Sequence, residues 1–218
     1  MNSLSVILLL AAISSSINRP SEKVIAPDET NQAGIPLAKH NPVWVDRHNG
    51  RRYALPTSIG EKPVSFYLKN PAVSPLAKAL YTSRFRPTDN DSTTQLLALA
   101  TTKNQEIRPF YRWCLDFTIA ISDGALGEYP GEPALAYATT YPQEFFSYMD
   151  KDKSGKRYER WRAIIAYSGP GSYNEANSAA KKKIIDRMAK NCPSCSDKIK
   201  HRISSFASDV TRTQAGHR

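Results

Sequence analysis

The sequence predicts a mainly α-helical fold, either an irregular multi-helix bundle or a short α-solenoid, with a small N-terminal β-hairpin. Three observations support this prediction. Apolar residues recur at helical spacing in most segments after residue 65, helix-starting residues precede several of these segments, and one Asn-Gly pair stands between alternating residues. The chain has 218 residues, of which 40% are hydrophobic, so it can build a core and is not wholly disordered.

The first 16 residues predict a signal peptide. Leu4 to Ile13 form an apolar run too short to span a bilayer comfortably, and three serines follow it where a signal peptidase would cut. The run lacks a basic segment before it, and a buried first helix is the alternative. Residues 17–41 contain three prolines and no periodicity, which indicates a flexible leader. We therefore expect an exported protein, periplasmic or extracellular, that is not an integral membrane protein after signal cleavage.

Residues 42–212 are predicted to form a single helical domain that opens with a hairpin over 43–55. Asn49-Gly50 favours a two-residue type I′ turn, because that turn needs positive φ at both central residues. Val43 and Val45 alternate before this turn, and Tyr53 and Leu55 alternate after it. A hairpin of this size is marginal alone, so it must lie on a larger core.

The helical elements follow in order. Ser74 is a good N-cap for a helix that begins at Pro75 and runs to about Ser83, and Asp91 begins another. The segment 107–121 is apolar on most sides, and only Arg108, Arg112 and Asp116 form a thin polar line spaced by four residues. We therefore predict that it is the central helix of the core.

Five further helices are predicted after residue 123. Their ranges are 133–140, 142–149, 157–167, 175–190 and 196–210. The last two would form a basic antiparallel hairpin over 175–210, closed by the turn between Cys192 and Cys195. No segment recurs at a fixed period, so no repeat family is indicated.

The formal charge of +10 resides entirely in the C-terminal part of the chain. Residues 1–150 hold 14 Lys and Arg against 14 Asp and Glu, whereas residues 151–218 hold 16 against 6. Such a bias suits contact with a polyanion or an anionic membrane surface, or is simply a solvated helix face. No specific nucleic-acid motif is present. The candidate binding residues are Lys181, Lys182, Lys183, Arg187 and Lys190.

Two short motifs raise the question of disulfide, redox or metal chemistry. Cys192 and Cys195 predict a local disulfide in an exported protein, with a catalytic dithiol as the alternative. Asp150, Asp152 and Ser154 resemble the first half of an EF-hand loop, but Trp161 stands where the loop needs a bidentate Glu. An ordinary polar turn is the preferred interpretation, and no metal or cofactor is predicted.

Two further groups of side chains could form a site in the middle of the chain. Asp123 and Glu128, in the loop 123–132, could act as an acid/base pair of the glycoside-hydrolase type, or Asp123 could serve as a helix cap, like Glu132. Seven of the 11 tyrosines fall between residues 129 and 173, so Tyr129, Tyr137 and Tyr141 are candidates for a binding face. Motifs of α/β-hydrolases, zinc proteases, P-loop enzymes and dinucleotide-binding enzymes are missing from the sequence.

The leading functional prediction is an exported, non-enzymatic interaction protein that recognises a protein or peptide. The loop 123–132 and the tyrosines would form its first face, and the basic hairpin a second. The alternatives are polyanion or membrane-surface binding by that hairpin, and hydrolysis by Asp123 and Glu128.

Overall fold

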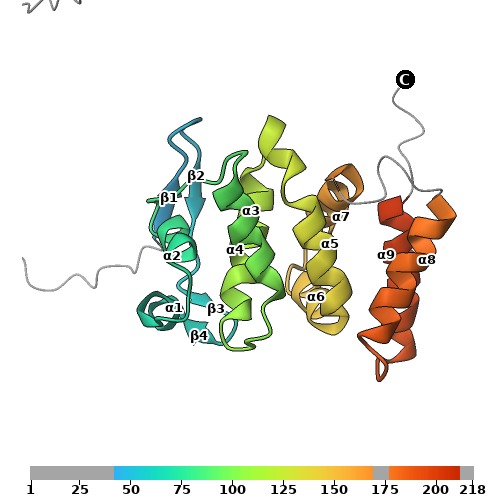
Figure 1. The fold of residues 1–218 in the computed structure, drawn as a ribbon. Helices are drawn as coiled ribbons and strands as arrows, with labels where there is room; N and C mark the ends of the chain where they lie inside the picture. The colour runs from blue at the N-terminus through green and yellow to red at the C-terminus, as the bar shows by residue number, and fades with distance from the viewer. Residues whose placement is uncertain (1–41, 169–176, 212–218) are drawn as a thin grey trace, which may run out of the picture. The chain divides into compact units, whose positions relative to one another are not determined.

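Helices dominate the computed structural model, which describes residues 42–168 and 177–211 (Figure 1). The prediction of a mainly α fold with a small N-terminal hairpin is confirmed. The predicted signal peptide, 1–16, and leader, 17–41, lie outside the described residues, as do the first two residues of the predicted helix 175–190.

The N-terminal hairpin has the predicted strands but a longer loop. β1 (Val43–Val45) pairs antiparallel with β2 (Arg52–Ala54), and Trp44 lies opposite Tyr53. Beyond the strand ends, Asp46 N–H donates to the Arg51 carbonyl, and Gly50 N–H donates to the Asp46 carbonyl. Four residues therefore lie between Asp46 and Arg51, the last hydrogen-bonded pair of the hairpin. The predicted two-residue type I′ turn is therefore wrong. Side-chain oxygens of Asp46 and Asn49 accept backbone N–H groups within the loop and stabilise the longer form.

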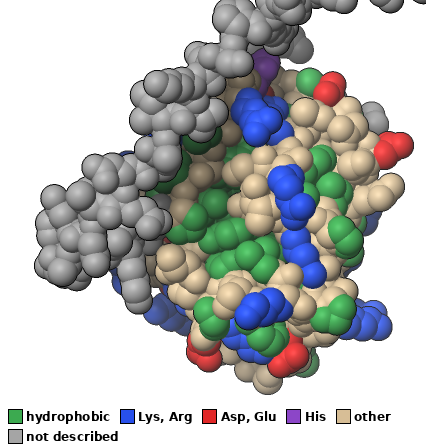
Figure 2. All heavy atoms as spheres, turned by 90° about the vertical axis from the view of Figure 1, so that its left-hand side faces the viewer, with side chains coloured by type: hydrophobic (Ala, Val, Ile, Leu, Met, Phe, Trp, Pro, Cys, Tyr) green, Lys and Arg blue, Asp and Glu red, His purple; other side chains and the backbone are tan. Residues whose placement is uncertain are grey.

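The hairpin buries Trp44 rather than the flanking valines. Trp44 is 2% exposed and packs edge-on against Tyr53 and Phe117, whereas Val43 and Val45 are each 42% exposed. The large indole thus occupies the inner face, and the alternation of the strand turns both valines outward. Figure 2 shows hydrophobic side chains gathered on the side of the molecule that carries this hairpin, beside Lys and Arg side chains.

Three small elements that were not predicted connect this hairpin to the first predicted helix. β3 (Ser58–Ile59) and β4 (Lys62–Pro63) form a second antiparallel pair, and α1 (Val64–Lys69) follows directly. α2 (Pro75–Tyr81) then begins as predicted, because the Ser74 hydroxyl accepts a hydrogen bond from Leu76 N–H.

The central helix α4 (Arg108–Ile121) separates two hydrophobic cores. Leu115 and Ile119 belong to the core built with the helices that follow. Phe110, Trp113 and Phe117 belong to the core that α4 shares with the N-terminal elements. Between α2 and α4 lie α3 (Asp91–Ala98), capped by Asn90, and the 3₁₀ helix η1 (Leu99–Thr101).

The remaining helices lie close to their predicted ranges. They are α5 (Gly131–Thr140), α6 (Pro142–Asp150), α7 (Lys156–Ser168), α8 (Asn177–Lys190) and α9 (Asp197–Thr211). A short 3₁₀ helix, η2 (Gly124–Glu128), lies in the predicted loop 123–132 and was not predicted. α5 begins two residues before its predicted start, so Glu132 lies inside its first turn and is not a cap. α4 ends at Ile121 with Ser122 as its C-cap. Asp123 stands at the N-cap of η2 without a side-chain capping hydrogen bond, and Gly124 begins η2 with a φ of 42°.

Helices pack both on their neighbours in sequence and on helices further along the chain. α4 packs against α7, α5 packs against α8, and α9 packs against α6 and α7. Within residues 42–168 and 177–211, none of the helices has the length and apolar character needed to cross a bilayer.

Candidate functional site

The polar line of the central helix is buried in the folded chain. Arg108, Arg112 and Asp116 stand four residues apart, and folding leaves Arg108 only 4% and Arg112 only 8% exposed. Removing a charged group from water costs several kcal/mol, so each of these side chains needs a compensating partner.

Arg108 has a full set of partners. Its Nε and Nη2 donate to the two carboxylate oxygens of Glu144 on α6, at 3.0 and 2.5 Å. Nη1 donates to the Thr102 carbonyl at 3.0 Å, and the guanidinium lies 3.9 Å from the ring centre of Tyr141. This two-point ion pair joins the start of α4 to α6.

Asp116, two turns further along α4, also has its partners. Its Oδ1 accepts from Nε1 of Trp161 at 2.8 Å, and its Oδ2 accepts from the Tyr148 hydroxyl at 2.7 Å. Arg157 lies 3.3 Å from the same carboxylate. Burial and the Asp116 charge raise the pKa of Tyr148, which therefore stays protonated and donates.

Arg112, between these two residues, lacks a carboxylate partner. Its Nη1 donates to the Tyr137 hydroxyl at 3.1 Å, and its guanidinium lies 4.1 Å from the ring centre of Tyr148. Burial raises the pKa of Tyr137 to about 12, so this partner is neutral. Nε of Arg112 is buried without a hydrogen-bond partner, and none of the described residues forms an ion pair with this guanidinium.

Arg112 lines a cleft of about 500 Å³ between the β3–β4 turn, the start of α4, and α6. We call it the polar cleft, because charged side chains supply about half of its lining. Its cations are Lys62, Arg108, Arg112 and Lys151, and its anions are Glu61, Glu106 and Glu144.

Ion pairing inside the polar cleft leaves one positive charge in excess. Lys62 pairs with Glu106 at 2.8 Å, and Arg108 pairs with Glu144. The rest of the charged lining consists of two cations and one anion that form no ion pair among residues 42–168 and 177–211: Arg112, Lys151 and Glu61. The cleft therefore carries a net positive charge that is suited to an anion.

The predicted basic residues lie together on α8. Lys182, Lys183, Arg187 and Lys190 are exposed, Lys181 is half-buried, and the opposite side of the helix buries Ile184 and Met188. Lys182 forms an ion pair with Asp186 at 2.5 Å. The basic residues thus share the solvent side of an amphipathic helix.

The predicted tyrosines do not form an exposed face. Tyr137 is fully buried and contacts Arg112, so its ring is not available to a partner. Tyr141 is half-buried and its hydroxyl donates to the carbonyls of Thr101 and Thr102. Tyr129 is half-buried against the hydrophobic core. Tyr137 is part of the core because its helix, α5, packs against η1, α6, α7 and α8.

Asp123 and Glu128 are both exposed and do not line the same pocket. Asp123 lines a second cavity of about 480 Å³ together with Arg160 and Tyr167, whereas Glu128 is not part of that lining. The Asp123 carboxylate also lies 3.9 Å from Nη2 of Arg86. Nothing in this geometry combines the two carboxylates as an acid/base pair.

The residues of the partial EF-hand pattern interact with the protein itself. Both oxygens of Asp150 accept from Arg202 on α9, at 2.8 Å each. Asp152 accepts from Ser154 and from Arg157 N–H at the start of α7, and these hydrogen bonds lower its pKa to about 2. The described part of the chain holds no cluster of three or more His, Cys, Asp or Glu side chains suited to a metal ion.

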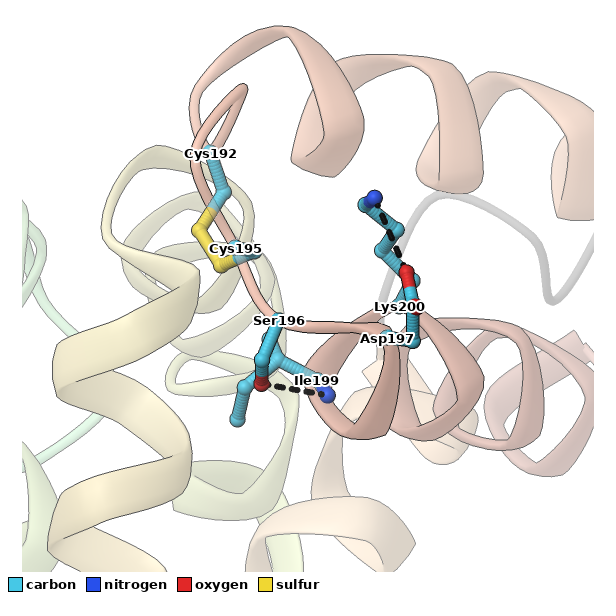
Figure 3. Close-up of a disulfide and its surroundings, with 6 residues drawn as sticks. All are labelled: Cys192, Cys195, Ser196, Asp197, Ile199 and Lys200. Carbon is cyan, nitrogen blue, oxygen red and sulfur yellow. Dashed lines mark hydrogen bonds and ion pairs between the residues drawn. A yellow bond between two sulfur atoms is a disulfide. The ribbon is translucent and has the colours of Figure 1, made fainter.

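Cys192 and Cys195 form a disulfide in the turn between α8 and α9 (Figure 3). Both residues are buried, and Ser196 follows as the residue whose hydroxyl accepts Ile199 N–H in the first turn of α9. The third cysteine, Cys114, is a buried free thiol on α4, and burial raises its pKa.

Comparisons with known proteins give no relative: no family model, no curated protein and no solved structure matches this chain.

Proposed function

We propose that this protein is a binding protein that recognises its partner through an anionic group held in the polar cleft. The observation that carries the proposal is Arg112, a buried guanidinium on the central helix that lines the cleft and has no carboxylate partner. An unpaired buried cation is costly, and an anion beside it would recover much of that cost.

The surroundings of Arg112 support recognition by a preorganised group. Tyr137 and Tyr148 hold its guanidinium by one hydrogen bond and one ring face, and Tyr148 is itself held by Asp116. Such a fixed arginine loses little conformational entropy when it binds a ligand. Lys151, exposed at the edge of the same cleft, adds a cation that would attract an anion from solution.

We further propose that the partner is a protein or peptide and that the protein works outside the cytoplasm. The apolar run near the N-terminus supports export, and so does the disulfide, because such bonds persist mainly in oxidising compartments. The cleft, and not the tyrosine-rich face expected from the sequence, is then the first recognition surface.

The test compares two lysines that are close in sequence but differ in their relation to the cleft. Lys151 and Lys153 are both exposed, and only Lys151 lines the polar cleft. Binding of acetate and of inorganic phosphate to the full chain would be followed by NMR of the arginine Nε–H groups. We expect a saturable shift of the Arg112 signal that Lys151→Glu weakens at least ~3-fold and Lys153→Glu leaves unchanged. Equal effects of the two substitutions, or no saturable shift, would contradict the proposal.

A second candidate function is polyanion binding by α8, favoured by its row of exposed cations. Lys182, Arg187 and Lys190 lie on the solvent side, within the segment that carries the whole excess charge. Binding to heparin or to vesicles with anionic lipids should then fall steeply with salt and be lost in the triple substitution to Glu. Binding that the triple variant retains would assign this face to solvation alone.

A further inference from the structure

We infer that the anionic group is a carboxylate, bound side-on by Nε and Nη2 of Arg112. The inference rests on the proposed function, since it specifies the chemistry of the ligand in the same cleft.

The chain itself shows how two of its other arginines hold carboxylates. Arg86 donates from Nε to Oδ1 of Asp46 at 2.8 Å and from Nη2 to Oδ2 at 3.2 Å. Arg108 holds Glu144 in the same way, with one hydrogen bond from Nε and one from Nη2. In both pairs, two donors on the same edge of a planar guanidinium match the two oxygens of a planar carboxylate.

Arg112 lines the cleft, and Nε on this same edge of its guanidinium has no protein partner. Its other edge is used, because Nη1 donates to Tyr137, and one face of the guanidinium lies on the Tyr148 ring. Nε has no hydrogen-bond partner. Because Nε is also buried, a carboxylate that engages this edge must displace the atoms that cover it.

The charge balance of the cleft favours a ligand with a single negative charge. After ion pairing, the cleft retains two cations and one anion: Arg112, Lys151 and Glu61. A carboxylate neutralises the remaining positive charge, whereas a phosphate dianion would leave an excess negative charge. Glu144 adds to this discrimination, since its carboxylate lies 3.4 Å from the hydroxyl of Tyr137, the residue that holds Arg112.

Two sources can supply such a carboxylate: the C-terminus of a peptide and a free monocarboxylic acid. The probes that distinguish them are acetate, N-acetyl-trialanine with a free C-terminus, and the same peptide with a C-terminal amide. Inorganic phosphate tests the competing charge state. Each would be titrated into the full chain while the Arg112 Nε–H signal is recorded.

We expect acetate and the peptide acid to shift the signal and the peptide amide to leave it unchanged, with phosphate at least ~10-fold weaker than acetate. Tighter binding of the peptide acid than of acetate would identify the peptide C-terminus as the source, and the reverse order would identify a free acid. Arg112→Lys keeps the charge but loses the two-donor edge, so we expect it to weaken acetate binding about 10-fold. Because this variant has no Arg112 Nε–H group, its acetate binding is measured by isothermal titration calorimetry beside that of the unchanged chain. A circular dichroism melt of this variant checks that it is folded, and Lys151→Glu provides a second variant outside the core.

The failure of this inference differs from the failure of the proposed function. Phosphate binding tighter than acetate, or full acetate binding by Arg112→Lys, would overturn the carboxylate assignment while anion binding in the cleft stands. If none of the probes shifts the Arg112 signal, both proposals are wrong.

Discussion

Nε1 of Trp161 on α7 lies 2.8 Å from Oδ1 of Asp116 on α4, and the indole donates a hydrogen bond across the interface of the two helices. The same carboxylate accepts from Tyr148 on α6 and pairs with Arg157 on α7. One acidic side chain therefore joins three helices and fixes the Tyr148 ring on which Arg112 lies.

Replacing Asp116 should destabilise the fold strongly. In Asp116→Ala, the buried Trp161 N–H and Tyr148 hydroxyl lose their acceptor, and Arg157 loses its counter-charge, so we expect a loss of about 3 kcal/mol in unfolding free energy. Urea denaturation followed by tryptophan fluorescence measures it. Asp186→Ala is the control, because the exposed pair of Asp186 with Lys182 should contribute less than ~0.5 kcal/mol. Similar losses in both variants would show that the buried network has no special role.

Gly131 should tolerate no side chain, whereas Gly127 should accept one. A Cβ on Gly131 would lie 2.1 Å from Oγ of Ser168 and 2.7 Å from the carbonyl oxygen of Ile164, so α5 and α7 would have to separate. We expect Gly131→Ala to cost about 2 kcal/mol, as overpacking commonly does. The nearest neighbour of a Cβ on Gly127 lies at 3.7 Å, an ordinary contact, and Gly127→Ala should change the melting temperature little. Thermal denaturation of both variants measures the difference. Equal melting temperatures for Gly131→Ala and Gly127→Ala would refute the close approach of α5 to α7 at Gly131.

The Asp46–Arg86 pair should make stability depend on pH. The hydrogen bonds from Arg86 lower the pKa of the buried Asp46 below its unfolded value, so the pair stabilises the fold above about pH 4 and the contribution is lost as the pH falls through the folded pKa. Asp46→Asn should therefore cost about 2–3 kcal/mol at pH 7 and much less near pH 2. Urea titrations at both values of pH test this. A cost that does not vary with pH would exclude the ion pair as its cause.

The three cysteines should differ in their reaction with a thiol reagent. Cys114 is a buried free thiol, and the other two form the disulfide. We expect no labelling of the native protein, one label after unfolding without reductant, and three after unfolding with reductant. Because the disulfide closes a very short loop, its reduction should cost about 2 kcal/mol on the chain-entropy estimate. Two or more labels without reductant would show that the cysteines are reduced in the isolated protein.

The sequence predicted the helices well because their signals are local. Ser74 caps α2 as expected, and the apolar period of residues 107–121 identified the central helix. The prediction of a two-residue hairpin loop was wrong because Asn49-Gly50 alone does not determine the register of the strands. Trp44 does, since it must be buried on the inner face, and the side chain of Asp46 stabilises the resulting four-residue loop.

The candidate site could not be found in the same way. The spacing of Arg108, Arg112 and Asp116 was visible, but a polar line on a helix normally faces solvent. Their partners Tyr137, Glu144 and Trp161 lie 25 to 45 residues away in sequence, so nothing local reveals that the line is buried. Tyr137 was placed on a binding surface for the same reason: its burial depends on helices that pack from elsewhere in the chain.

The position of α4 between two cores affects how the protein unfolds. Leu115 and Ile119 belong to one core, and Phe110, Trp113 and Phe117 belong to the other. Loss of either core would expose one side of α4 and weaken the packing of the opposite side. We therefore expect the N-terminal and C-terminal elements to melt in a single cooperative transition, and the backbone amides of α4 to exchange with solvent only when the whole unit opens.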